Sequence, residues 1–237
     1  MEINARLTQV ATLVGDLDKA DAQVRDLFGF EEGYHESGMA MFGLENTVQP
    51  IGERQYLEVC GQLREGESQR PVGGRRGNGG YMAIVEVSRR EDIALCRQRL
   101  AAQGLRVVHE IVQDEYESIH VHPRDLGTIV SFDWNGGPWP GIAADWQGPI
   151  RTDVITAIAG IELRSASPDE YAKRWATVLG LDVENGVVTL PGDGSTVRFA
   201  GGRSDDEAGL DVIDFVATAR TRAGESHDIG GTEFRLV

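Results

Sequence analysis

The sequence predicts an α+β protein built from repeated small modules, each with a strand, then a helix, then further strands. An apolar stretch, a turn and an amphipathic helix occupy residues 7–28, and the same order of features returns from residue 80 and from residue 158. The interval of ~75 residues suits a duplicated module rather than a solenoid repeat. Two pairs of modules are therefore expected, the fourth module being truncated.

In the first module, residues 6–14 form a mostly apolar strand. Asp16 can cap the next helix by accepting backbone amide protons, and apolar residues recur at helical spacing up to residue 28. Gly29 supplies the left-handed stop. Two short strands are expected to follow, at residues 39–44 and 55–60.

The second module begins with a strand at residues 81–87. Ser88 and Glu91 have the spacing of a capping box, and Gly104 is expected to end the helix. Three further strands are predicted, at residues 106–112, 118–122 and 128–134.

The third module has a second capping box, Ser167 with Glu170, and Pro168 at the first helical position. Its helix should end at Gly180. The later strands of the chain are expected at residues 187–190, 196–199, 210–217 and 232–237, with no convincing helix between the last two.

The expected domain boundaries follow this module count. Residues 1–134 hold two modules, and residues 153–237 hold a second, degenerate pair. Residues 135–152 contain three Pro, two Trp and several Gly without periodicity, which is typical of a connector.

Composition limits the function classes. The 237 residues carry a formal net charge of −15, with a pI near 4.7. Nucleic-acid and anionic-membrane partners are disfavoured, because their binders present basic faces. No apolar run has the length of a membrane span, and the N-terminal residues lack a secretion signal. Two widely spaced cysteines favour a reducing, cytoplasmic location.

Four segments together resemble the vicinal oxygen chelate superfamily, which includes glyoxalases, bleomycin-resistance proteins and extradiol dioxygenases. They are Leu7–Leu17, Leu27–Phe30, Tyr56–Val59 and His122–Asp133. The resemblance covers residues 5–134 well and residues 154–237 more faintly. It implies βαβββ modules that close in pairs into cupped mixed sheets around a small-molecule cavity.

The resemblance also implies a divalent metal (Fe, Zn, Ni or Mn), held by the first and last strands of paired modules. Gln9 and Glu58 fall on ligand positions of the first module, and Asp133 or Ser131 falls on the last strand of the second. Met82 stands where such metal enzymes usually have His, and a thioether is a poor ligand for these metals. Metal binding is therefore one expectation and a metal-free cup is the other.

The corresponding positions of the third and fourth modules hold Gly160 and Arg235, neither of which is a ligand. The resemblance thus implies that the C-terminal half is a scaffold, or mimics the second subunit of a dimer.

Glu58 and His120 are the expected catalytic residues. A carboxylate in an apolar strand must face water, a partner or a ligand, because burying it alone is costly. His120 and His122 share one face of a strand, and imidazole changes charge near neutral pH. His122 precedes Pro123, so a turn role competes with substrate binding there. Met82, His122 and Ser131 are the expected substrate-binding residues.

The leading hypothesis is an enzyme of the lyase, isomerase or dioxygenase type. It would abstract a proton next to a carbonyl, or cleave a ring, in an oxygenated organic molecule. The alternative is a metal-free protein that binds or sequesters a small molecule. Either a monomer or a homodimer is expected, because two fused module pairs can replace a dimer.

Overall fold

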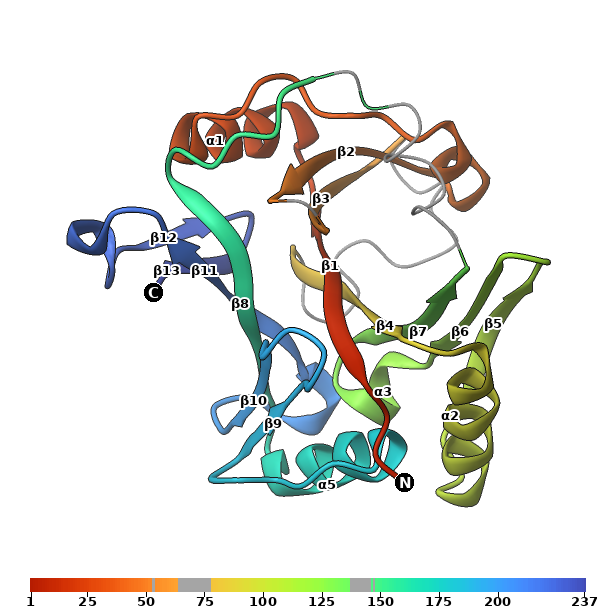
Figure 1. Ribbon diagram of the computed structural model, residues 1–237. Coiled ribbons are helices and arrows are strands. Elements are labelled where there is room, and N and C mark those ends of the chain that lie inside the picture. The colour runs from red at the N-terminus through yellow and green to blue at the C-terminus, as the bar shows by residue number, and fades with distance from the viewer. Residues whose placement is uncertain (53, 64–77, 137–145, 147) are drawn as a thin grey trace. The chain divides into compact units, whose positions relative to one another are not determined.

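The computed structural model describes residues 1–52, 54–63, 78–136, 146 and 148–237 (Figure 1). It contains a seven-stranded mixed sheet of order β2-β3-β1-β4-β7-β6-β5 and a six-stranded mixed sheet of order β12-β13-β11-β8-β10-β9. The predicted α+β class with modular mixed sheets is confirmed.

The chain divides into two compact units that interleave in sequence. The first comprises residues 1–8, 82–139 and 160–210, and the second comprises residues 9–81, 140–159 and 211–237. Each unit thus joins one N-terminal module to one C-terminal module. These units follow spatial contacts, so the domain boundaries expected along the chain, at 134 and 153, stay a prediction.

The second module is the complete one, with a strand, a helix and three further strands. β4 pairs parallel with β7, and β6 pairs antiparallel with both β7 and β5. Its elements are β4 (Gly79–Val87), α2 (Arg90–Ala102), β5 (Val107–Val112), β6 (Tyr116–Val121), the one-turn α3 (Pro123–Leu126) and β7 (Ile129–Asn135).

The first module is one strand shorter than the second. The strand expected at residues 39–44 is wrong: Ser37–Phe42 forms a 3₁₀ helix, η1, that ends at Gly43 with φ 70°. The strand that pairs with β3 follows η1. Before η1, Tyr34 forms one isolated bridge with Val48 of that strand. The elements are β1 (Ala5–Val14), α1 (Leu17–Phe28), β2 (Leu44–Ile51) and β3 (Gln55–Gln62).

The two C-terminal modules are also shortened. The strands expected near residues 210–217 and 232–237 are present, and a short strand between them was not predicted. The elements are β8 (Ile155–Arg164), α5 (Pro168–Leu179), β9 (Val187–Thr189), β10 (Thr196–Ala200), η2 (Asp205–Glu207), β11 (Gly209–Ala217), η3 (Arg220–Arg222), β12 (Ser226–Ile229) and β13 (Thr232–Leu236).

The helix termini were predicted unevenly. Asp16 caps α1 by accepting from the Lys19 amide, and Gly29 ends it with φ 72°. The capping box at Ser88 is wrong, because α2 starts two residues later and its N-cap, Arg89, makes no side-chain cap bond. Ser167 is the N-cap of α5, but its hydroxyl donates to Asp205 instead.

Each unit has its own aromatic core. In the first unit, the Trp175 ring of α5 lies 6.3 Å from Phe132 and 6.2 Å from Phe199 between ring centroids. In the second, the Phe28 ring of α1 lies 4.9 Å from Phe215. Both cores join modules from the two halves of the chain. No helix among the described residues is long and apolar enough to span a membrane.

Replacing Trp175 with Phe should destabilise the protein by about 2–4 kcal/mol. The buried indole N–H donates to the carbonyl oxygen of Leu126 at 2.9 Å, and the substitution leaves that acceptor unpaired beside a cavity. Urea unfolding followed by circular dichroism measures the loss. The control is Trp134→Phe, at a half-buried indole beside Arg90, which should cost below about 1 kcal/mol. Equal losses would contradict this account.

Candidate functional site

Glu58 lies on β3 in the second unit, where three neutral groups hold its carboxylate. The side chain is only 5% exposed. Gln9 Nε2 donates to its Oε2 at 2.8 Å, while Asn46 Nδ2 and Cys60 Sγ donate to its Oε1 at 2.7 and 3.2 Å. No Lys or Arg of the described residues forms an ion pair with it. Within the described part of the chain, hydrogen bonds therefore compensate for the burial of this carboxylate.

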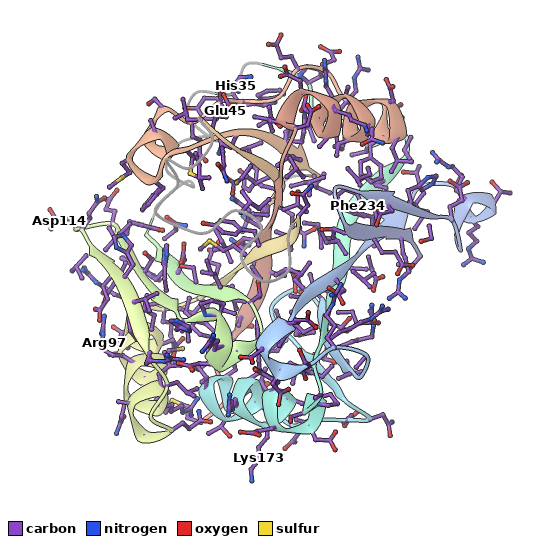
Figure 2. The ribbon with its side chains drawn as sticks, turned by 180° about the vertical axis from the view of Figure 1, so that it is seen from behind. His35, Glu45, Arg97, Asp114, Lys173 and Phe234 are labelled. Atoms are coloured by element: carbon purple, nitrogen blue, oxygen red, sulfur yellow. The ribbon has the colours of Figure 1, made fainter. Side chains whose placement is uncertain are left out.

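Asn46 on β2 links Glu58 to a second carboxylate, Glu36. The same amide nitrogen donates to Glu36 Oε2 at 2.9 Å, and the Glu36 backbone N–H donates to Asn46 Oδ1 at 3.0 Å. His35 Nδ1 forms a hydrogen bond with the backbone carbonyl oxygen of Asn46 at 2.7 Å. Figure 2 shows His35 beside the neighbouring Glu45 of β2. These contacts fix the Asn46 amide, so that its second proton points at Glu58.

The pKa of Glu36 is raised. Burial is the main cause, the nearby charge of Glu58 adds to it, and the hydrogen bond from Asn46 opposes it. Glu36 is half-buried, whereas Glu58 is buried. In the second unit, the side-chain amide of Asn46 therefore donates to two carboxyl groups, and Glu36 is the one closer to solvent.

The first unit holds a separate acidic group, Asp133 on β7. Its side chain is fully buried. Tyr116 Oη donates to its Oδ2 at 2.8 Å, and Ser131 Oγ donates to its Oδ1. Complete burial raises the pKa of Asp133 to about 7 against the lowering effect of these two bonds, and the charge of Glu86 adds to the rise.

His120 lies on β6, in register with Ser131 on one side and His109 on the other. It is half-buried, and its ring centroid lies 5.1 Å from that of His109. The three side chains point to one face, because directly opposed residues of paired strands share a face.

His122 is the N-cap of α3, where its Nδ1 accepts from the Arg124 backbone N–H at 3.2 Å. Burial lowers its pKa, and the charges of Arg106 and Arg124 lower it further. Met82 is nearly buried on β4 and pairs in register with Ile129. Substrate binding by His122, Met82 and Ser131 stays a prediction.

The structure brings together two of the three expected metal ligands, Gln9 and Glu58, within the second unit. Asp133 belongs to the first unit. Sequence reasoning missed Asn46, because the strand that positions it was placed five residues too early. Tyr116 and Ser118 were also missed, although alternate residues of a strand share a face and both therefore lie on the same face as His120.

Within each unit, the donors do not fit a metal centre. Protein metal sites need three or more nitrogen, oxygen or sulfur ligands. Among the residues that the structure describes, no group of three or more His, Cys, Asp or Glu could hold an ion. Gln9 and Asn46 turn amide nitrogens toward Glu58, and hydroxyls surround Asp133. The expected metal therefore enters no step below.

The C-terminal modules have other residues at the equivalent positions. A side chain at Gly160 would collide with Thr196, whose carbonyl oxygen would lie 2.4 Å from its Cβ. Arg235 Nε donates to Asp214 at 2.9 Å, and Arg164 pairs with Glu162 at 2.8 Å. Ion pairs and close packing thus replace candidate ligands in this half.

Comparison with known proteins agrees with this architecture. The family model of the glyoxalase-like domain matches residues 10–179, more than half of the chain. The chain belongs to this family, and through it to the vicinal oxygen chelate superfamily. No curated protein sequence matches it significantly.

Solved structures share the fold at low sequence identity. A hypothetical protein from Staphylococcus aureus has TM-score 0.69 and 14% identity, with 98% of each chain covered. The Mn(II)-bound glyoxalase from Novosphingobium aromaticivorans has TM-score 0.64 and 14% identity, covering 99% of this chain and 82% of that one. A mutant 4-hydroxymandelate synthase from Streptomyces coelicolor has TM-score 0.62 and 13% identity, covering 91% and 71%. At these identities the likeness shows the fold alone.

Replacing Asp133 with Asn should flatten the pH dependence of stability. Between about pH 4 and pH 7 the folded protein holds a proton on Asp133 that the unfolded chain has lost. The contribution of Asp133 to the free energy of unfolding therefore falls as pH rises through this window, by about 1 kcal/mol per pH unit. Asn has no such proton, so the variant should gain stability relative to wild type as pH rises.

Urea unfolding at several pH values measures this difference. Asp114→Asn is the control, because Asp114 is exposed at the tip of the β5–β6 hairpin (Figure 2) and should leave the slope unchanged. A wild-type slope in the Asp133 variant would contradict the account.

Proposed function

We propose that the protein is an enzyme that abstracts a proton next to the carbonyl group of a small oxygenated organic molecule. Glu58 is the base. The observation that supports this most is a buried carboxylate held by three neutral donors, with no cation paired to it among the described residues. A Lys or Arg partner would favour the charged form and weaken the base.

The geometry assigns the two oxygens of Glu58 different roles. Each carboxylate oxygen has two acceptor positions. Among the described residues, Oε1 accepts from Asn46 and Cys60, whereas Oε2 accepts only from Gln9. Oε2 therefore has the remaining acceptor position and is the atom that takes the proton.

In the proposed step the substrate C–H bond breaks and an O–H bond forms at Glu58 Oε2. The electron pair moves into the adjacent C–C bond, and the carbonyl oxygen gains negative charge. Return of the proton to the same or a neighbouring carbon gives exchange, inversion or isomerisation. Gln9, Asn46 and Cys60 orient the carboxylate, and Glu36 keeps Asn46 in place.

A second candidate is metal-free binding of a small molecule. It is favoured by the apolar side chains of Met82 and Ile84, each 8% exposed on β4. Apolar walls with few polar groups are typical of ligand cavities. Turnover by the purified protein separates the two candidates, because a binding protein needs no base.

Deuterium exchange tests the proposal directly. Hydroxyacetone, acetoin and phenylacetone are incubated with the protein in deuterated buffer, and loss of the proton next to the carbonyl is followed by NMR. We expect the wild type to accelerate exchange of at least one ketone. Glu58→Gln should reduce the rate by about 10²-fold or more, which is the usual contribution of a general base.

Glu45→Gln is the matched control, because Glu45 lies on β2 beside Asn46 but is exposed, and it should retain the wild-type rate. Exchange that is equal in the wild type and Glu58→Gln would contradict the proposal. Elemental analysis provides a second arm: near-stoichiometric Fe, Zn, Ni or Mn that disappears in Glu58→Gln would make Glu58 a ligand and overturn its role as base.

A further inference from the structure

The Gln9 side chain lies beside the proposed base in the second unit. Gln9 belongs to β1, where it is in register with Tyr56 of the neighbouring strand β3, two residues before Glu58. Alternate residues of a strand share a face, so the side chains of Gln9 and Glu58 point to one side of the sheet. The hydrogen bond of 2.8 Å from Gln9 Nε2 to Glu58 Oε2 places the amide nitrogen directly beside the carboxylate.

The same nitrogen carries a second proton. The side-chain amide nitrogen of glutamine has two N–H groups, and Gln9 donates one of them to Glu58. The other has no acceptor among the residues that the structure describes. Gln9 is only 5% exposed, and buried polar groups in native proteins are generally paired. The second N–H group is therefore suited to an acceptor that a bound molecule supplies.

The spacing of the carboxylate and the amide matches a carbonyl compound. In a ketone, the carbonyl oxygen and the carbon with the acidic proton are about 2.4 Å apart, since a trigonal carbon joins bonds of about 1.5 and 1.2 Å. Glu58 Oε2 and Gln9 Nε2 are 2.8 Å apart. One ketone can therefore direct its C–H group toward Oε2 and its oxygen toward the second N–H group of Nε2.

We propose that Gln9 is a second catalytic residue, whose side-chain N–H binds the substrate carbonyl oxygen while Glu58 removes the neighbouring proton. The inference rests on the proposed function of Glu58. When the C–H bond breaks, its electron pair forms a C–C double bond, and an electron pair of the carbonyl group moves onto oxygen. Gln9 keeps its proton. Its hydrogen bond strengthens as the oxygen gains negative charge, which lowers the barrier.

The surroundings of the pair favour a neutral substrate with an apolar group. Cys60, which donates to Glu58, belongs to a buried apolar cluster against which Met39 and Phe42 of η1 pack. Apolar walls with a few placed polar groups are typical of ligand sites. A keto acid is disfavoured, because its carboxylate would be repelled by the charge of Glu58. An aromatic ketone such as phenylacetone is the suitable probe.

Isotope-edited infrared spectroscopy of bound phenylacetone tests the role of Gln9. We expect the wild type to lower the C=O stretching frequency below its value in apolar solvent, because a hydrogen bond weakens the carbonyl double bond. Gln9→Met keeps the length of the side chain but has no donor. It should lose the shift and reduce the rate of deuterium exchange by about 10²-fold or more, the usual effect of removing one such donor.

Asn46→Leu is the matched control. Asn46 also donates to the Glu58 carboxylate, at 2.7 Å to Oε1, but is not expected to contact the substrate oxygen. The variant should slow exchange and still retain the shifted C=O frequency. Gln9→Ala also lacks the donor, and it replaces Gln9→Met in the test if that variant is unstable in urea.

An unshifted C=O band in the wild type would overturn the role of Gln9, as would equal frequencies in the wild type and Gln9→Met. The shift should persist after treatment with chelator, and its loss there would assign it to a metal instead. The two proposals fail separately. Exchange that requires Glu58 without a shift that requires Gln9 would leave Glu58 as the base, whereas the shift without any exchange would overturn proton abstraction and leave Gln9 as a carbonyl-binding residue.

Discussion

The cost of burying carboxylates without cations is the constraint that governs this structure. Glu58 and Asp133 are both withdrawn from water, yet neither has a Lys or Arg partner among the described residues. Neutral donors compensate instead: amides and a thiol for Glu58, and hydroxyls for Asp133. Of the two, Glu58 is the group that we propose as a base, because its Oε2 keeps an acceptor position among the described residues.

The four modules differ in their strand content and in how their buried charged groups are paired. The second is complete, and the first is reduced but supplies Gln9, Asn46 and Glu58. The C-terminal modules satisfy their charged residues internally, as in the bond between Arg235 and Asp214. They also contribute to the aromatic core of each unit, through Trp175 and Phe215. These contacts support the prediction that the C-terminal half is a scaffold, and the proposed base, Glu58, lies in the N-terminal half.

Much of the fold could be predicted from local patterns. Asp16 and Gly29 mark the ends of α1 because capping depends on neighbouring residues only. The network around Glu58 depends on register between strands, which local pattern does not set. Asn46 was missed for this reason: the preceding residues form a 3₁₀ helix rather than the expected strand, and β2 begins where that strand was expected to end. Pairing of each N-terminal module with a C-terminal one is likewise a tertiary property.

The most direct test of the central claim is the rate of deuterium exchange next to the carbonyl of hydroxyacetone, acetoin and phenylacetone, compared between wild type, Glu58→Gln and Glu45→Gln. The account predicts acceleration for at least one ketone that is lost in Glu58→Gln by about 10²-fold or more and retained in Glu45→Gln. Exchange that is no faster than in buffer for every ketone, or that persists without the Glu58 carboxylate, would contradict it.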